Sequence, residues 1–80
     1  MVTPESIQHN IAHGMDTEFL RVEGDDGTHF QAVIVSPMFE GKSRVQRHQL
    51  VYQTLGDRMR EEIHALSMKT FTPQEWQSQK

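Results

Sequence analysis

The sequence contains no cysteine, and this absence excludes several kinds of chemistry at once. A chain without cysteine forms no disulfide, offers no thiolate nucleophile and cannot by itself build a thiolate-ligated iron or zinc site. Any thiolate that takes part in its function must therefore come from another molecule. Long apolar segments are missing as well, because the longest uninterrupted apolar run, Ala32–Val35, falls far short of the ~20 residues that cross a membrane.

Basic residues are too few for a generally basic surface. The 80 residues include 8 Lys and Arg against 11 Asp and Glu, which gives a formal net charge of -3. This balance argues against a general electrostatic attraction to nucleic acid or to an anionic membrane, but it allows a local basic patch. Residues 1–5 show no basic segment before an apolar stretch, so we expect a cytoplasmic protein that makes no membrane contact.

Capping and turn residues in the first half predict one helix followed by a β-hairpin. Thr3-Pro4-Glu5 is typical of a helix start, because proline suits the first helical position, and His13-Gly14 is typical of a helix end. Two strand-like segments, 17–23 and 29–36, flank the polar turn Gly24–Gly27, and this arrangement predicts a hairpin. The residues that would share one apolar face of the helix are Ile7, Ile11 and Met15.

The second half is expected to contain a long helix, a third strand and a short final helix. Ser43 and Gln46 match a capping box at the start of the long helix, and Gly56 weakens this helix in its middle. Residues 64–70 alternate as a half-buried strand should, and Thr72-Pro73 is typical of another helix start. The apolar stripe expected on the long helix consists of Val45, Leu50, Val51, Tyr52, Leu55, Met59 and Ile63.

This order of elements predicts one α+β domain over residues 1–80, in which a three-stranded mixed sheet packs against helices in two layers. The short turn makes the first two strands antiparallel, whereas the helical crossover makes the third strand parallel to the second. His29 opens the second strand and His64 opens the third, so both imidazoles are expected at one end of the sheet, on strands ~4.8 Å apart. Two imidazoles are too few for most transition metals, so they would form half of a shared site.

The remaining histidines have more ordinary interpretations. His9 and His13 have the i, i+4 spacing of two metal ligands on one helix face, but no third ligand is evident. Their alternative role is the favourable placement of cations near a helix end. His48 lies on the apolar side of the long helix, where a buried or half-buried, hydrogen-bonded imidazole is expected.

Catalytic motifs are not evident, and we expect the protein not to be an enzyme. Ser36, Ser43 and Ser67 occur without the strand-turn-helix pattern of an exposed nucleophile. The acidic pairs Asp25-Asp26 and Glu61-Glu62 are most simply interpreted as solvated surface.

Lys42, Arg44 and Arg47 form the only dense basic cluster in the sequence. They crowd the start of the long helix, where the helix dipole disfavours cations, and this placement suggests an anionic partner such as DNA. A solvated basic face is the alternative. The G-x-x-G pattern at Gly24–Gly27 is no second candidate, because its two aspartates would repel phosphate.

Five ordered motifs over residues 3–77 together resemble the BolA family. The segment Asp26–Phe30 is similar to the short bacterial, IbaG-like branch of that family. The motifs are Gly27–Phe30, Val35–Gly41, Arg47–Tyr52, Ile63–Leu66 and Thr72–Trp76.

The resemblance implies a fold similar to a class II KH domain and a non-enzymatic role in iron-sulfur cluster trafficking or in iron, redox and acid-stress signalling. The implied partner is a monothiol glutaredoxin, which with glutathione would share a bridging 2Fe-2S cluster with this chain. Without the partner, the chain would carry no cofactor and would be a monomer or a weak dimer.

The resemblance also implies roles for particular residues. The family's cluster ligand in the Ile-His-Ala-Leu motif corresponds to His64, and its second ligand, from the loop between the first two strands, corresponds to His29. The alternative function that the family implies is DNA-binding transcriptional regulation. The region proposed to touch DNA includes Lys42, Arg44 and Arg47.

Overall fold

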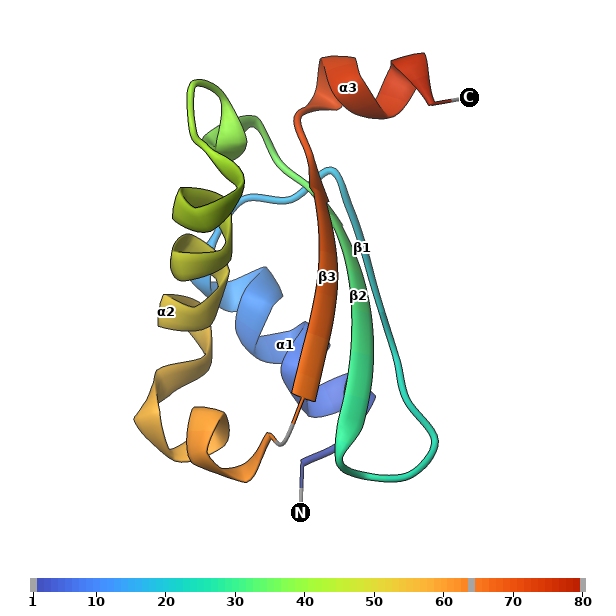
Figure 1. Ribbon diagram of the computed structural model, residues 1–80, viewed down its shortest axis with the longest axis vertical. Helices are drawn as coiled ribbons and strands as arrows, with labels where there is room; N and C mark the ends of the chain where they lie inside the picture. The colour runs from blue at the N-terminus through green and yellow to red at the C-terminus, as the bar shows by residue number, and fades with distance from the viewer. Residues whose placement is uncertain (1, 64, 80) are drawn as a thin grey trace.

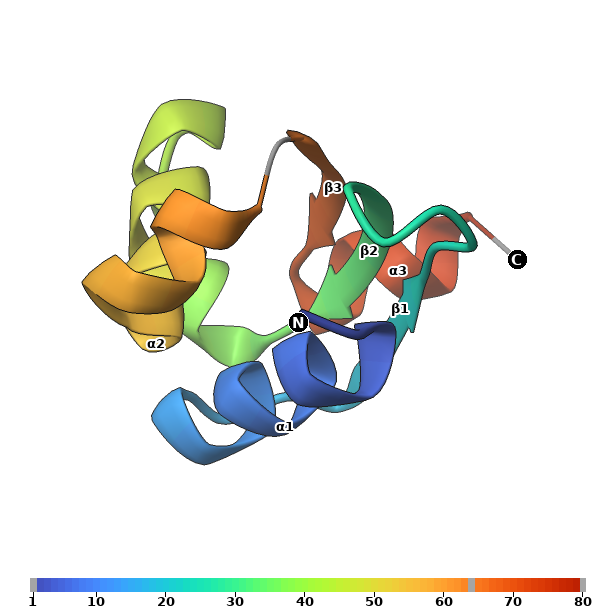
Figure 2. The same ribbon diagram turned by 90° about the horizontal axis from the view of Figure 1, so that it is seen from below.

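A computed structural model describes residues 2–63 and 65–79, and it has two layers, a sheet and the helices that cover one of its faces (Figure 1). Helices α1 and α2 pack on that face, whereas the short α3 lies beyond the end of β3 (Figures 1 and 2). This arrangement confirms the two-layer α+β fold. The elements are α1 (Pro4–Gly14), β1 (Phe19–Glu23), β2 (His29–Val35), a 3-10 turn (Pro37–Phe39), α2 (Arg44–Glu62), β3 (Ala65–Phe71) and α3 (Pro73–Ser78).

The sheet has three strands in the order β1-β2-β3, so that β2 is central and β3 has one free edge. Strands β1 and β2 are antiparallel, and β2 and β3 are parallel. The mixed topology predicted from the hairpin turn and the helical crossover is therefore confirmed. In the register of β2 and β3, His29 lies opposite Ala65 and Val35 lies opposite Phe71.

Capping boxes close the N-terminal ends of α1, α2 and α3. In each box a hydroxyl accepts a hydrogen bond from the backbone three residues later, and the side chain at that later position accepts one in return. These local bonds explain why the helix starts could be predicted from the sequence. The pairs are Thr3 with Ser6, Ser43 with Gln46, and Thr72 with Glu75.

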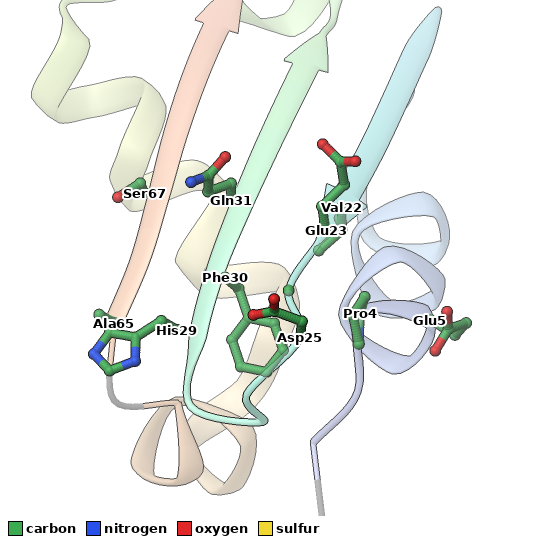
Figure 3. A pocket seen from close by; sticks show the side chains of 11 residues that line it. Pro4, Glu5, Val22, Glu23, Asp25, His29, Phe30, Gln31, Ala65 and Ser67 are labelled. Atoms are coloured by element: carbon green, nitrogen blue, oxygen red, sulfur yellow. The ribbon is translucent and has the colours of Figure 1, made fainter.

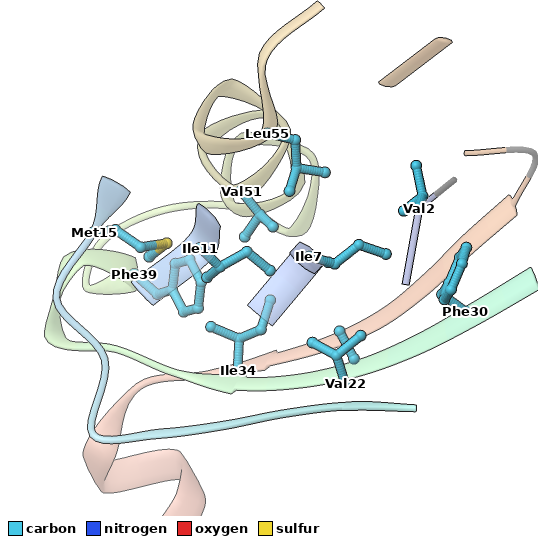
Figure 4. Close-up of a cluster of buried hydrophobic side chains, with 11 residues drawn as sticks. Val2, Ile7, Ile11, Met15, Val22, Phe30, Ile34, Phe39, Val51 and Leu55 are labelled. Carbon is cyan, nitrogen blue, oxygen red and sulfur yellow. The ribbon is translucent and has the colours of Figure 1, made fainter. Parts of the chain in front are cut away.

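The core lies between the sheet and the two longer helices (Figure 4). Ile7 and Ile11 of α1 are fully buried, as expected, and they meet Ile34 of β2 and Val51 of α2. Burial alternates along the first part of β2, because successive side chains point to opposite faces of the sheet. The second face of β2 includes His29, which is exposed.

The expectation that Val45 belongs to the apolar stripe of α2 is wrong, because this residue is 65% exposed. The buried pair Val51 and Leu55 defines the inward face of the helix. With 3.6 residues per turn, the positions that continue this face toward the N-terminus are 47 and 48 rather than 45. The first turns of α2 therefore direct Arg47 and His48, both half-buried, toward the sheet, whereas Arg44 is exposed.

Gly56 interrupts α2 rather than merely weakening it. Its backbone angles, φ 78 and ψ 161, are not helical and fall in a region that is essentially restricted to glycine. Figure 1 shows the resulting bend, after which the last turns of α2 lead the chain toward the start of β3.

Candidate functional site

His29 lies at the start of the central strand, beside the start of β3. Its register partner is Ala65, the first residue of β3, and the Ala65 N–H donates to the carbonyl of Thr28 at 3.1 Å. The parallel pairing thus brings the beginnings of these two strands together, as the sequence predicted. The other proposed ligand, His64, immediately precedes Ala65 in the sequence and lies outside the described residues.

Asp26 organises the turn that leads into His29. One oxygen, Oδ1, accepts the backbone N–H of Thr28 at 2.9 Å and that of His29 at 2.8 Å, and Oδ2 lies 2.8 Å from His29 Nδ1. The backbone N–H of His29, followed by that of Thr28 and the His29 ring, holds the pKa of the Asp26 carboxyl well below its usual range.

The sequence interpretation of Asp25-Asp26 as solvated surface missed this role of Asp26. A local signal was available, because an aspartate that accepts the N–H two residues later forms the Asx-turn that favours this residue in tight turns. What the sequence did not indicate is the second contact, from the carboxylate to the His29 ring.

A pocket of about 650 Å³ opens at this end of the sheet (Figure 3). His29 and Ala65 lie side by side at its edge, and Glu5 lies on the opposite side, at the start of α1. Glu23 and Asp25 add two further carboxylates. The pocket lining therefore combines the His29 imidazole with the carboxylates of Glu5, Glu23 and Asp25. Beside the imidazole, Ala65 presents only a methyl group.

The histidines on α1 form a separate pair. The ring centroids of His9 and His13 are 4.1 Å apart, and His13 Nδ1 lies 3.1 Å from the carbonyl oxygen of His9. Within residues 2–63 and 65–79, no group of three or more His, Asp or Glu could hold a metal ion.

The predicted basic cluster is divided by the fold. Arg47 is largely buried, with 13% of its side chain exposed, and it binds both carboxylate oxygens of Glu75 at 2.8 and 3.2 Å. It also donates to the carbonyl oxygens of Lys42 and Thr70. The Arg47 guanidinium, assisted by the backbone N–H of Thr72, lowers the pKa of Glu75 to about 2.

Arg44, by contrast, faces a groove between α2 and the free edge of β3. We call this the cationic groove; it has a volume of about 440 Å³ and is lined by Arg44, His48, Met68, Lys69, Thr70 and Phe71. His48 is half-buried, as expected. Lys69 was not singled out in the sequence, because it is far from Arg44 along the chain and only the packing of β3 beside α2 brings both to one groove.

The free edge of β3 is partly protected beside this groove. The carbonyl of Leu66 accepts the hydroxyl of Tyr52 at 3.5 Å, and the carbonyl of Thr70 accepts Arg47. Side chains from α2 therefore occupy backbone acceptors on both sides of Met68.

Within the described ranges, no helix is long and apolar enough to span a membrane.

Solved structures share the fold of this chain. The family model described as BolA-like protein matches residues 1–75 of the chain. The chain belongs to the BolA-like family. This finding confirms the resemblance that the five sequence motifs predicted, and the fold of this BolA-like chain is matched by solved structures of the same family.

Three similar proteins illustrate the range of the BolA-like family. The chain is 39% identical over 71 residues to the acid stress protein IbaG of Escherichia coli K12, covering 88% of this chain and 83% of that protein. It is 35% identical over 88 residues to the DNA-binding transcriptional regulator BolA of Haemophilus influenzae, covering 99% and 85%. A solved bolA protein homologue from Coxiella burnetii is 46% identical, with a TM-score of 0.79 and coverage of 96% and 99%.

Proposed function

We propose that this BolA-like protein is a non-enzymatic partner of a monothiol glutaredoxin and that His29 and His64 co-ligate a bridging 2Fe-2S cluster. The glutaredoxin and glutathione would supply the two thiolates that a chain without cysteine cannot provide. Imidazoles replace two thiolates on one iron in Rieske centres, so this mixed donor set is chemically sound.

The observation that carries the proposal is the position of His29. Its side chain is 60% exposed, so a second protein can reach it. Opposite it in the register stands Ala65, whose methyl group leaves room on this side of the sheet. The ordered contact with Asp26 fixes the ring at this edge. These features fit a ligand that is offered to a group held jointly with a partner.

The names of the relatives support a cellular role without catalysis. One relative is named an acid stress protein and others are named transcriptional regulators. A cluster shared between two proteins would let a stress response depend on iron and thiol supply, and we expect such a pairing in the cytoplasm. The protein alone would be a monomer or weak dimer without a cofactor.

A titration tests the proposal directly. Cluster-loaded monothiol glutaredoxin is titrated with this protein while absorption and circular dichroism are recorded. Replacing two thiolates by imidazoles alters the electronic spectrum of the cluster, so a new spectrum should develop to a one-to-one end point. His64→Ala should lose most of this change, His29→Ala should lose part of it, and His9→Ala on α1 should behave as wild type. An unchanged spectrum with the wild-type protein contradicts the proposal.

DNA binding is a second candidate function, and the cationic groove favours it. Several relatives are named DNA-binding regulators. Arg44 and Lys69 both line the groove, whereas Arg47 is already bound to Glu75. The groove thus replaces part of the basic cluster inferred from the sequence, with Lys42 exposed nearby.

The salt dependence of affinity reports how many phosphate contacts this function makes. About three phosphate contacts, from Lys42, Arg44 and Lys69, would give a slope near ~-3 in a plot of log affinity against log salt. Fluorescence anisotropy with labelled DNA at two salt concentrations measures the slope. Lys69→Gln should reduce it by about one contact, while Arg21→Gln on β1 should leave it unchanged. No binding at low salt excludes this function.

A further inference from the structure

Asp26 contacts both the backbone and the ring of His29. Its two oxygens lie 2.8 Å from the backbone nitrogen and 2.8 Å from the ring nitrogen Nδ1 of His29. A carboxylate accepts hydrogen bonds and donates none, so a hydrogen bond at this distance requires the proton to reside on Nδ1. In a neutral imidazole with a proton on Nδ1, the lone pair is on Nε2.

We propose that Asp26 is a positioning residue that holds neutral His29 in the Nδ1–H tautomer and so makes Nε2 its ligand atom. The tautomer follows from the contacts of the chain itself, whereas the ligand role rests on the proposed function. Carboxylates and carbonyls commonly hold the second ring nitrogen of a metal-binding histidine in this way, which fixes both tautomer and ring direction.

The carboxylate is anchored independently of the ring. Oδ1 is bound by two backbone N–H groups, from Thr28 and His29, before the ring contact through Oδ2 is considered. Because these bonds belong to the turn, the ring adjusts to the carboxylate rather than the reverse. This anchoring matters because the pair is exposed, with 60% and 50% of the two side chains accessible, and a lone exposed contact would orient the ring only weakly.

Thr28 is the competing partner for the same ring nitrogen. Its Oγ1 lies 3.0 Å from His29 Nδ1 and 3.3 Å from Asp26 Oδ1. If the Thr28 hydroxyl donated to Nδ1, the ring would be in the opposite tautomer, and the Nδ1 lone pair would then face Asp26 Oδ2 at 2.8 Å. Such an approach of two acceptors is repulsive, so the carboxylate selects Nδ1–H and the hydroxyl donates to Asp26 instead.

Asp26→Asn tests this role because asparagine has nearly the same shape as aspartate but can donate a hydrogen bond to His29 Nδ1, where the carboxylate can only accept one. The amide oxygen can still accept the backbone N–H groups of Thr28 and His29, so the turn is retained. The amide nitrogen then replaces Oδ2 and donates toward Nδ1, which favours a proton on Nε2 and removes the lone pair from that atom. Asp25→Asn makes the same charge change at the neighbouring position and serves as the matched control.

The first measurement needs neither iron nor partner. Long-range ¹H–¹⁵N correlation spectra of the imidazoles, recorded at a pH where they are neutral, report which ring nitrogen carries the proton. We expect mainly Nδ1–H at His29 in wild type and in Asp25→Asn, and a tautomer ratio shifted roughly tenfold or more toward Nε2–H in Asp26→Asn. Wild-type protein with mainly Nε2–H at His29 overturns the inference, and this result does not depend on how the variant folds.

The second measurement separates the inference from the proposed function. In the titration with cluster-loaded glutaredoxin, Asp26→Asn should lose as much of the spectral change as His29→Ala, while Asp25→Asn should retain it. If the tautomer inverts in Asp26→Asn and the spectrum still develops fully, His29 is not a ligand through Nε2, and that part of the proposal is overturned. If the tautomer does not respond, the positioning role itself is wrong, whatever the cluster does.

Discussion

Arg47 and Glu75 form a bidentate ion pair that joins the beginning of α2 to α3, with nitrogen-to-oxygen distances of 2.8 and 3.2 Å. The guanidinium carbon also lies 5.7 Å from the centroid of the Phe39 ring. Helix α3 also contacts the sheet through Trp76, whose ring stacks on that of Phe19 with the centroids 5.2 Å apart. A residue that the sequence grouped with a DNA-binding cluster therefore connects elements within the protein.

Replacing Arg47 should destabilise the fold. Arg47→Ala removes the ion pair and leaves the carbonyl of Thr70 without this donor, and we expect a loss of about 1 kcal/mol in the free energy of unfolding, mainly from the lost hydrogen bond to that carbonyl. Urea denaturation monitored by Trp76 fluorescence measures it. Lys42→Ala, on the exposed neighbour in the same cluster, should change stability by less than ~0.5 kcal/mol. Equal effects of the two changes would contradict the structural role of Arg47.

The same ion pair predicts how stability depends on pH. The pKa of Glu75 falls from its ordinary value of 4.5 to about 2 in the folded protein. Because the folded-state pKa is the lower one, the contribution of the carboxylate is complete above about pH 4.5 and is lost as the pH falls toward 2.

Glu75→Gln isolates this effect, because glutamine can keep the capping bond to Thr72 while it loses the ion pair. Wild type should be more stable than the variant at neutral pH, and the two unfolding curves should converge as the pH is lowered through this range. Glu61→Gln on the exposed end of α2 supplies the control for the charge change. A wild-type advantage that persists unchanged to pH 2 would show that the ion pair is not its source.

Much of the fold could be predicted because its signals are local. The capping box of Ser43 and Gln46 and the turn Gly24–Gly27 each act within a few residues, so the sequence alone indicates them. The parallel pairing of β2 and β3 followed from the length of the crossover rather than from any residue. Its consequence, His29 beside the start of β3, was therefore predictable without knowledge of the register.

The parts of the site that could not be predicted depend on contacts between distant segments. Arg44 and Lys69 share the cationic groove only because α2 packs beside β3. Arg47 is largely buried because Glu75 of α3 lies next to it and binds its guanidinium. Charge spacing along one helix cannot distinguish a cation that binds an outside anion from one that binds a distant carboxylate. The contact between Asp26 and the His29 ring likewise depends on the conformation of the whole turn.

The break in α2 predicts a backbone effect at Gly56. An alanine there would have to adopt φ 78 and ψ 161, a region that residues with a side chain rarely occupy, although a Cβ would meet no atom within 4 Å. We expect Gly56→Ala to lower stability by about 1–3 kcal/mol through strain alone, measured by thermal or urea denaturation. Gln53→Ala, exposed on the preceding turn, should be nearly neutral. A stabilised Gly56→Ala variant would mean that α2 runs through this position as a continuous helix.

Two valines on α2 provide a final test of which helix face meets the sheet. Val51 is fully buried, whereas Val45 is 65% exposed although a reading of apolar residues alone places both on one stripe. Val51→Ala should cost about 2 kcal/mol in the free energy of unfolding, because it removes two methyl groups and leaves a cavity against Ile7 and Ile11. Val45→Ala makes the identical chemical change and should cost less than ~0.5 kcal/mol. If the two losses are similar, the helix is rotated relative to the orientation described, and Arg44 and His48 would then no longer face the cationic groove.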